Sequence, residues 1–250
     1  MSDYRTVRGM RDFLPKEAKK MKYIEDKARK VAYLYGYKEI ITPVLETYQL
    51  LAAKTGEEIR SRMYTFEDLG GRKVALRPEF TASVARLVAN TLKTEPKPLR
   101  LFCVGSLYRY DEPQKGRFRE FWQSNYELMG STQPEADVEI IMLTNRFMKA
   151  VGLKKITFKI GHVGVLTGIL SQENIEEEIQ NRIMHLMDKK QVDDALNLVD
   201  ESGASEKCLT TLKQLMKIEG EKPLEACQKM ENQVKGYRKP SKAVNNLQEI

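Results

Sequence analysis

The stretch from Tyr108 to Gly130 carries the side chains whose types and spacing are best suited to chemistry. Its first part is rich in lysine and arginine and contains a proline and a glycine, which is typical of a loop. Its second part alternates with period two, so every second side chain of the predicted strand lies on the same face. One face then carries Arg119, Phe121, Gln123, Asn125 and Glu127, and the other carries Trp122, Tyr126 and Leu128.

This hairpin could hold an amino acid beside a polyphosphate. A carboxylate and an amide, here Glu127 and Gln123, can receive the amino acid, while guanidinium and ammonium groups bind phosphate. The cations are supplied by the loop residues Lys115, Arg117 and Arg119. The alternation alone is equally compatible with an ordinary antiparallel strand that has one solvated face. Both interpretations stay open at this point.

Turn residues and hydrophobic spacing predict the elements that must position the hairpin. Proline and glycine punctuate the chain at the ends of most of these segments. The sequence THR-GLN-PRO-GLU at 132–135 is a capping box that begins a helix, and Gly152 ends it. Strands are predicted over residues 37–42, 61–66, 73–77, 99–108, 119–129 and 156–160, and helices over residues 15–35, 81–92 and 132–151.

The chain divides by composition into two predicted domains. Its 250 residues, 41% of them hydrophobic, can bury a sizeable core in one or two domains. Residues 171–250 carry apolar stripes at helical spacing and no strand pattern, and Pro223 begins a last helix. We therefore predict a mixed α+β domain over 1–170 and an all-α module over 171–250.

Charge and rare residues limit the classes of function. The net charge of +7 is unevenly placed, since residues 1–170 carry +10 and residues 171–250 carry −3. The basic part fits a polyanionic ligand or nucleic acid, although an excess of lysine can also serve solubility alone. Three scattered cysteines predict a reducing cytoplasm. Two isolated histidines argue against a protein-built metal site, and no apolar run is long enough to span a membrane.

Four segments in the same order resemble the histidyl-tRNA synthetase family, a branch of the class II aminoacyl-tRNA synthetases. The sequence RGMRDFLP at 8–15 resembles the opening segment of that family, and residues 15–43 resemble its motif 1. The sequence LRPEFT at 76–81 is similar to its amino-acid-binding segment. The hairpin resembles motif 2, with the phrase PQKGR at 113–117. Together the resemblance covers residues 5–170.

The resemblance implies a fold and a reaction. The fold is α+β, an antiparallel six-stranded sheet flanked by helices, followed by an all-α insertion, in a cytoplasmic homodimer assembled through motif 1. The histidine carboxylate attacks the α-phosphate of ATP, which carries Mg²⁺, and releases pyrophosphate. A ribose hydroxyl of tRNA(His) then takes the histidyl group. Such catalysis needs no protein nucleophile and no protein-bound metal, because it rests on positioning and on charge stabilisation.

The resemblance also implies roles for residues at the ATP end of the site. Arg109 corresponds to the catalytic arginine that contacts the α-phosphate and the histidine carboxylate. Arg117 matches the arginine that holds the terminal phosphate, and Phe121 the ring on which adenine stacks, although Phe121 could simply pack. Asp111 stands where the family usually has glutamate, so its shorter side chain could loosen an ATP or metal contact.

Further residues are implied at the histidine end. Glu79, Phe80 and Thr81 lie in the amino-acid-binding segment, and Glu79 and Thr81 match the groups that receive the α-amino group. Thr81 could instead act only as a helix cap. Gln123 and Glu127 match the residues that hold the substrate, and Glu127 accepts a hydrogen bond from the imidazole. A charge-assisted bond selects a ring N–H that few amino acids offer.

Three functions remain to be compared. The family continues beyond its insertion to a histidine-specific segment, motif 3 and an anticodon-binding domain, so the resemblance implies that residues 1–250 are a fragment with little activity alone. The alternative is a non-catalytic regulatory subunit of ATP phosphoribosyltransferase, a relative that tends to lose the ATP-binding loop. A basic RNA-binding module would explain the charge but not the paired Glu79 and Glu127. The intact loop favours the synthetase.

Overall fold

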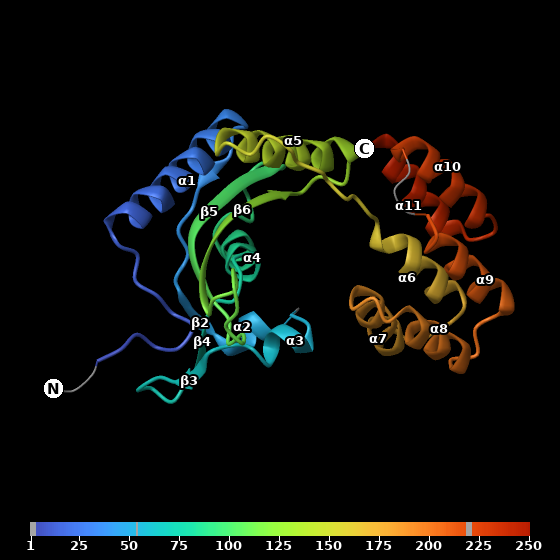
Figure 1. The fold of residues 1–250 in the computed structure, drawn as a ribbon, viewed down its shortest axis with the longest axis horizontal. Coiled ribbons are helices and arrows are strands. Elements are labelled where there is room, and N and C mark those ends of the chain that lie inside the picture. The colour runs from blue at the N-terminus through green and yellow to red at the C-terminus, as the bar shows by residue number, and fades with distance from the viewer. Residues whose placement is uncertain (1–3, 54, 219–221) are drawn as a thin grey trace. The chain divides into compact units, whose positions relative to one another are not determined.

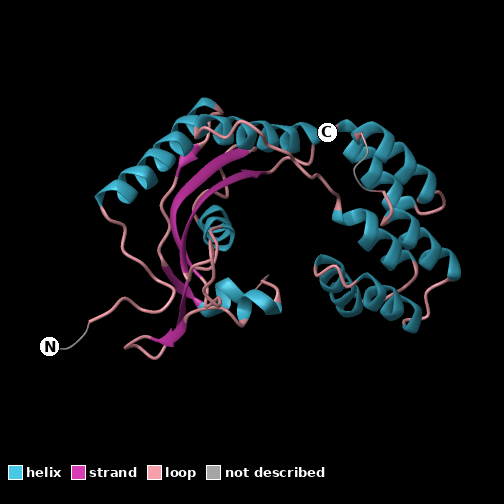
Figure 2. Cartoon of the chain, viewed as in Figure 1, coloured by secondary structure: helices cyan, strands magenta, loops and turns pink. Residues whose placement is uncertain are grey.

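The computed structural model describes residues 4–53, 55–218 and 222–250. The chain forms two compact units, Met1–Ile156 and Thr157–Ile250, and each is described by itself (Figure 1). The first unit mixes strands and helices, and the second is helical (Figure 2). The elements of the first unit are α1 (Pro15–Leu34), β1 (Lys38–Glu39), β2 (Leu45–Thr47), α2 (Tyr48–Ala52), α3 (Glu57–Arg60), β3 (Thr65–Glu67), β4 (Lys73–Leu76), α4 (Thr81–Asn90), β5 (Leu99–Tyr108), β6 (Glu120–Met129) and α5 (Pro134–Ala150).

The hairpin of β5 and β6 dominates the first unit. The two strands pair antiparallel in a continuous register that runs from Leu99 opposite Met129 to Tyr108 opposite Glu120. The period-two pattern of the sequence is therefore confirmed, and Gln123 and Glu127 share a face. On its other side β5 pairs with the short strand β1, and this pairing is parallel.

The mixed α+β class is confirmed, but the strands are not joined into one six-stranded sheet. Within the described residues they form two three-stranded sheets, in the orders β1-β5-β6 and β2-β4-β3. The second sheet is antiparallel throughout. The pairing of β1 with β5 also departs from the wholly antiparallel sheet that the resemblance implied. Strand β1 can pair in this way because residues 40–98 connect it to β5, and a connection of that length can return the chain to the same end of the sheet.

Helices α1 and α5 cover one face of the hairpin (Figure 1). Arg100 of β5 and Glu139 of α5 join strand and helix through N–O contacts of 2.7 and 2.8 Å. Hydrogen bonding from Arg100 lowers the pKa of Glu139 below its ordinary value, so the pair is fully charged at neutral pH. The buried apolar side chains on this face are Val31, Ala32, Tyr37, Phe102 and Leu143, with Tyr126 and Leu128 of β6 packed against them.

Helix α4 covers the opposite face, which carries the predicted site residues. Phe80 and Val84 pack there against the β5 side chains Leu101, Cys103 and Leu107, and Phe121 of β6 is partly buried beside them. The face of the hairpin that holds Gln123 and Glu127 is therefore half apolar. A polar ligand on this face would lie next to a hydrophobic floor rather than on a fully solvated strand.

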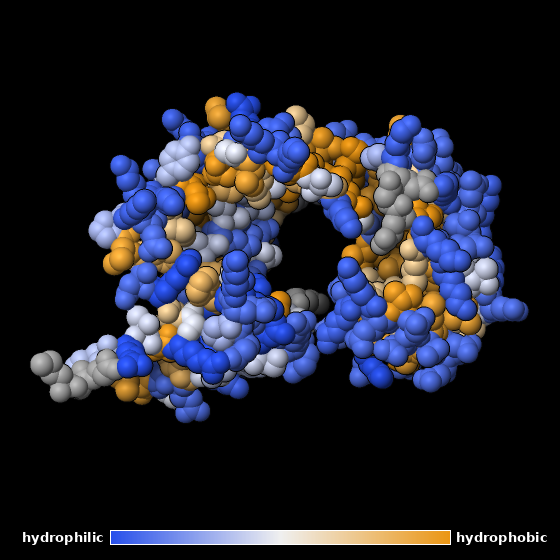
Figure 3. All heavy atoms as spheres, in the orientation of Figure 1, coloured by the Kyte–Doolittle hydropathy of each residue, from blue (hydrophilic) through white to orange (hydrophobic). Residues whose placement is uncertain are grey.

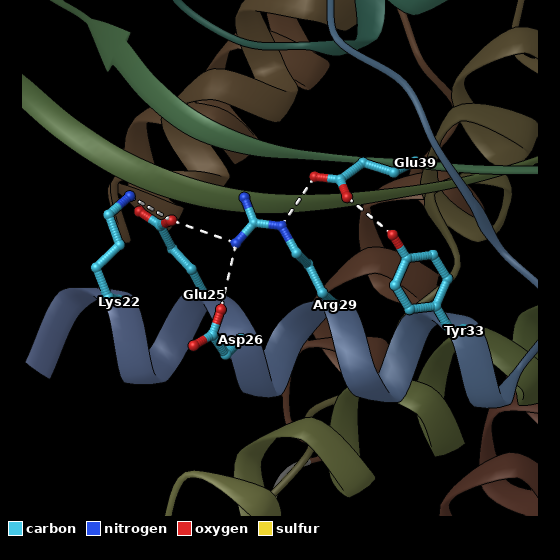
Figure 4. Close-up of polar contacts among 6 residues, drawn as sticks. All are labelled: Lys22, Glu25, Asp26, Arg29, Tyr33 and Glu39. Atoms are coloured by element: carbon cyan, nitrogen blue, oxygen red, sulfur yellow. Dashed lines mark hydrogen bonds and ion pairs between the residues drawn. The ribbon is translucent and has the colours of Figure 1, made fainter. Parts of the chain in front are cut away.

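One face of α1 carries a network of charged side chains (Figure 4). The Glu25 carboxylate, only 6% exposed, accepts from Lys22 at 2.9 Å and from Arg29 at 3.3 Å. Arg29 also donates to Glu39 of β1 at 2.9 Å, so the network ties the helix to the strand. The neighbouring Ile24 side chain is 41% exposed. Glu25 takes the inward position because two cations offset its burial.

Several predicted boundaries are wrong, each for a local reason. Residues 37–42 and 61–66 give shorter strands, at Lys38–Glu39 and Thr65–Glu67. The alternating segment 156–160 forms no strand, because alternation supplies an apolar face but no hydrogen-bonded neighbour. The capping box also fails to form: Gln133 is the N-cap of α5 and makes no side-chain capping bond. Gly152 does end that helix with a positive φ of 100°.

The second unit consists of helices around a core of its own. Its buried residues include Ile169, Ile183, Val199, Leu212 and Val244. On the face seen in Figure 3, hydrophilic residues cover most of the surface of this unit and hydrophobic ones gather on part of it. This unit begins at Thr157, and residues from Val165 onward contribute to its core. Its elements are α6 (Val163–Gln172), α7 (Glu177–Asp188), α8 (Val192–Glu201), α9 (Glu206–Leu215), α10 (Pro223–Gln233) and α11 (Arg238–Glu249).

The three cysteines are free thiols, and all are buried. Cys103 belongs to the first unit, whereas Cys208 and Cys227 belong to the second. Burial raises the pKa of Cys103 and of Cys208 to about 12, and it also raises the pKa of Cys227. None of the helices in the described part of the chain has the length and apolar character needed to cross a membrane.

Candidate active site

A carboxylate on β6 links that strand to the beginning of α4. Glu127 Oε1 accepts from Thr81 Oγ1 at 2.7 Å and from Asn125 Nδ2 at 2.9 Å. The Glu79 carboxylate accepts from the backbone N–H of Ala82 at 2.8 Å and from that of Thr81. Glu79 therefore caps the helix, and the Thr81 hydroxyl is turned to Glu127 instead. The proposed histidine contacts Glu79, Thr81 and Glu127 are thus brought together.

Gln123 places an unsatisfied oxygen on the same face. Its Oε1 atom is buried and has no hydrogen-bond partner among the described residues. Gln123 lies opposite Gly105, where an added Cβ would come within 3.2 Å of Arg77 Nη2 and 3.6 Å of Phe80 Cζ. The absence of a side chain at residue 105 leaves room for Arg77 and Phe80 at this point. A buried carbonyl oxygen without a donor is costly, so this position favours a ligand that supplies an N–H.

Arg77 holds the floor of the site in place. Its Nη1 donates to the carbonyl oxygen of Thr42 at 2.7 Å, and its Nε donates to that of Ser106 at 3.2 Å. The guanidinium carbon lies 4.5 Å from the centre of the Phe80 ring. Burial lowers the pKa of Arg77 below its ordinary value. Because Phe80 is only 2% exposed beneath this arginine, its side chain can contribute shape to the site, and its contact with histidine stays a prediction.

Arg109 lies where β5 ends, between the LRPEFT segment and β6. Its Nε donates to the carbonyl oxygen of Pro78 at 2.9 Å. Its guanidinium carbon is 5.1 Å from the centre of the Phe121 ring, a cation–π contact. The proposed catalytic arginine therefore contacts the residue that precedes Glu79 in the chain. It also lies against Phe121, the ring proposed to support adenine.

Asp111 forms the centre of the hairpin loop. Its side chain is buried, receives a 2.7 Å hydrogen bond from Arg117 Nε, and makes a 3.2 Å ion pair with Arg62 Nη1. Its backbone oxygen accepts from Arg119 Nε at 3.0 Å. The loop turns between Gln114 and Arg117, where Gly116 has a φ of 80° that favours glycine. The exposed Lys115 lies at the tip of this turn.

Arg119 is not a free loop cation, contrary to the sequence prediction. Its side chain is buried and its guanidinium carbon lies 3.7 Å from the centre of the Tyr110 ring. Its backbone N–H donates to Gly9 at 2.8 Å. Gly9 has a φ of 84°, and an added Cβ would come within 2.6 Å of the Arg119 side chain. Arg119 therefore fastens the N-terminal segment to the loop.

The N-terminal segment makes further contacts with the hairpin. The Arg11 guanidinium lies 3.9 Å from the centre of the Phe118 ring, and Phe13 packs edge-on against Trp122 with ring centres 5.2 Å apart. Arg8 forms an ion pair with Glu112. The segment RGMRDFLP therefore supports the loop that carries the proposed phosphate-binding residues.

The predicted residues fall into two groups, one between α4 and the hairpin strands and one in the hairpin loop. Glu79, Thr81, Gln123 and Glu127 lie toward α4, with Arg109 and Phe121 adjoining them, whereas Asp111 and Arg117 lie in the loop. Arg62 was missed, because it falls in a segment predicted as a strand and is 49 positions from its partner, with no spacing pattern to reveal it. Among the described residues, no group of three or more histidine, cysteine, aspartate or glutamate side chains could hold a metal ion.

Comparisons with known proteins show which family the chain resembles. The family model described as Histidyl-tRNA synthetase matches residues 9–250. The histidine–tRNA ligase of Methanocaldococcus jannaschii is 43% identical over 248 residues, which are 99% of this chain and 58% of that protein. The histidine–tRNA ligase of Sulfolobus acidocaldarius is 48% identical over 197 residues, covering 78% of this chain and 46% of that protein.

Solved structures show the same likeness. A Bacillus halodurans protein, described as an ATP phosphoribosyltransferase regulatory subunit/histidyl-tRNA synthetase, superposes with a TM-score of 0.85 at 28% identity, covering this whole chain and 64% of that one. The histidyl-tRNA synthetase of Nostoc sp. PCC 7120 superposes with a TM-score of 0.79 at 20% identity, a likeness of fold that covers 57% of that chain. The chain spans about half the length of the curated relatives it matches. With a family model that matches nearly all of it and relatives above 40% identity, the chain belongs to the histidyl-tRNA synthetase family.

Proposed function

We propose that the protein acts as a histidine–tRNA ligase and that the first unit holds the sites for histidine and ATP. The observation that carries this proposal is the polar cluster on the α4 face of the hairpin. There the Glu127 carboxylate lies beside Thr81, and the buried Gln123 oxygen has no donor among the described residues. An imidazole or an ammonium group offers the N–H donor that the Gln123 oxygen lacks and a charge-assisted bond to the Glu127 carboxylate.

The proposed reaction follows from what lies on either side of this cluster. Histidine bound there directs its carboxylate toward Arg109, and one carboxylate oxygen attacks the α-phosphorus of ATP while pyrophosphate leaves. Arg109 stabilises the charge that develops on the α-phosphate, and Phe121 supports the adenine ring. In the second step a ribose hydroxyl of tRNA(His) attacks the carbonyl carbon, and AMP leaves. In this proposal Mg²⁺ enters with the phosphates of ATP.

The second candidate is a regulatory subunit of ATP phosphoribosyltransferase, a description that the Bacillus halodurans neighbour shares. A regulatory subunit has no need of a nucleotide site. In this chain the loop cation Arg117 is held in place by Asp111, and Arg109 is held by the Pro78 carbonyl oxygen. Two ordered arginines on one hairpin support phosphate binding and therefore favour the ligase.

Binding of both substrates tests the proposal. We expect calorimetric titration to show that the protein binds ATP and histidine, each at its own site, and that histidinol, which keeps the imidazole and amine, also binds. Leucine serves as the control because it has no ring N–H to offer to Glu127. Histidine binding with no ATP binding would favour the regulatory subunit, and binding of neither would contradict the proposal.

We also propose that the protein is a cytoplasmic homodimer. Helix α1 and the segments after it expose apolar side chains, whereas Val31 of the same helix is buried in the core of its own unit. We propose that these side chains meet in the dimer interface, because exposed apolar patches mark interaction sites. The exposed residues are Tyr23, Ile24, Tyr33, Leu34, Ile41, Val44, Leu45, Phe66 and Leu69.

Sedimentation equilibrium tests the dimer. We expect a dimer at tens of micromolar protein, because burying an apolar patch of this kind supplies most of the free energy of association. Ile41→Glu should shift the equilibrium toward the monomer, since the Ile41 side chain is 92% exposed and a charge there opposes burial. The control is Met142→Glu on α5, where the replaced side chain is also exposed. A monomer in the parent protein would contradict the prediction.

A further inference from the structure

Asp111 lies between the side chains of Arg62 and Arg117, and both of these are more exposed to solvent than the Asp111 side chain. Its own side chain is 7% exposed, whereas those of Arg62 and Arg117 are 33% and 47% exposed. Each carboxylate oxygen faces a different arginine, Oδ1 toward Arg62 and Oδ2 toward Arg117. The carboxylate therefore has little surface left with which to contact a nucleotide directly.

The bond from Arg117 to Asp111 leaves the two terminal nitrogens of the guanidinium group available to bind phosphate. Asp111 Oδ2 accepts from Nε at 2.7 Å, which is the nitrogen nearest the aliphatic stem. A guanidinium is a rigid planar fork, so fixing Nε also fixes the direction of both terminal nitrogens. The side chain is about half exposed, and its terminal nitrogens are the groups suited to a bidentate bond with phosphate.

Arg62 keeps this arrangement from cancelling the charge of Arg117. One buried carboxylate with a single arginine would leave a neutral pair that attracts phosphate weakly. Because Arg62 lies 3.2 Å from the other oxygen, the Asp111 carboxylate is shared between two guanidinium groups, and Arg117 is offset by only part of its charge. Arg62 is itself fixed, because Nη2 contacts Glu58 at 2.8 Å and its backbone oxygen accepts from Tyr110 at 2.7 Å.

We propose that Asp111 is a positioning residue, which aims Arg117 at the terminal phosphates of ATP while Arg62 neutralises its charge. This inference rests on the proposed function and assigns to Asp111 a role through Arg117, rather than a direct ATP contact. Arg62 thereby becomes a part of the ATP site that touches no substrate. If Asp111 acts through Arg117, replacing it changes the affinity only for nucleotides that have terminal phosphates.

Comparing ATP with AMP in a double-mutant cycle tests the proposal. The proteins are the parent, Asp111→Asn, Arg117→Ala and the double variant, and calorimetry gives the dissociation constants of both nucleotides. We expect Asp111→Asn to weaken ATP binding about tenfold, the scale of one charge-assisted hydrogen bond, and to leave AMP binding unchanged. In the Arg117→Ala background the same change should alter ATP binding less than about twofold, because the two residues act as a unit.

The control is Glu95→Gln, which removes an exposed carboxylate outside the hairpin and should leave ATP binding unchanged. Arg62→Gln is the second variant, in case Asp111→Asn does not fold, and it should also weaken ATP binding but not AMP binding. Equal losses for ATP and AMP, or an undiminished loss in the Arg117→Ala background, would overturn the positioning role. So would unchanged ATP binding in Arg62→Gln. A parent protein that binds neither nucleotide would instead overturn the proposed function on which the role rests.

Discussion

Replacing Arg109 with alanine should slow histidine activation about a hundred- to a thousandfold, the usual cost of removing one preorganised donor from a charge-stabilising site. Arg109 is held by the Pro78 carbonyl oxygen and by the Phe121 ring, so it is ordered before substrate arrives. A group ordered in advance loses little freedom in the transition state, and most of its interaction energy lowers the barrier. The loss should therefore appear in kcat of histidine-dependent ATP–pyrophosphate exchange.

Arg117→Ala should behave differently in the same assay. Arg117 lies in the loop and is proposed to hold a terminal phosphate in the ground state and in the transition state alike. Its loss should raise the KM for ATP about tenfold with a smaller change in kcat, the pattern of uniform binding. Arg146→Ala serves as the control, since it removes an exposed cation from α5 on the other face of the hairpin. Identical profiles for Arg109→Ala and Arg117→Ala would mean that their roles are wrongly assigned.

Glu127→Gln should weaken histidine binding by about 1.5–3 kcal/mol, the value of a hydrogen bond to a charged group at a partly buried position. The substitution keeps the size of the side chain but removes the charge to which Thr81 and Asn125 now donate. An amide also offers an N–H where the imidazole N–H must approach. ATP binding should change far less, because Glu127 lies at the α4 end of the face. Calorimetry with each ligand separates the two effects.

The matched control for this change is Glu120→Gln. Glu120 lies on the same strand, but its parity places it on the face opposite Glu127, where it accepts from the Tyr108 hydroxyl at 2.9 Å. The same chemical change there should leave histidine affinity within about twofold, as expected for a substitution remote from the ligand. If both variants lose histidine equally, the loss reflects the stability of the hairpin and not a contact with the ring.

The sequence predicted best those elements whose pattern is long and whose ends carry turn residues. Helix α1, opened by Pro15 and closed by Gly36 with a φ of 76°, and the ten-residue strands of the hairpin are of this kind. Short elements were predicted less well, because the extent of a strand such as β1 is set by its neighbour. The segment 156–160 shows the same limit, since a pattern of side chains cannot supply the backbone partner that a strand requires.

The site was predictable as a set of residues but not as a set of contacts. Resemblance named Glu79 and Glu127, yet the bond from Thr81 to Glu127 spans 46 positions and depends on how α4 packs against the hairpin. Arg62 had no sequence signal at all, because an ion pair between distant residues leaves no spacing pattern. The inward turn of Arg119 likewise depends on Gly9, which only the folded chain brings near. These contacts belong to tertiary structure, where local pattern carries no information.

The distribution of the buried thiols has a practical consequence. A thiol reacts as its thiolate, so a pKa near 12 together with burial leaves Cys103 and Cys208 almost inert toward alkylating reagents while the chain is folded. Modification then requires local opening, and its rate reports how often that opening occurs. Because Cys103 lies in the mixed unit and Cys208 in the helical unit, the protein carries a separate reporter in each. Mass spectrometry of the labelled peptides can therefore measure the opening of the two units independently in one sample.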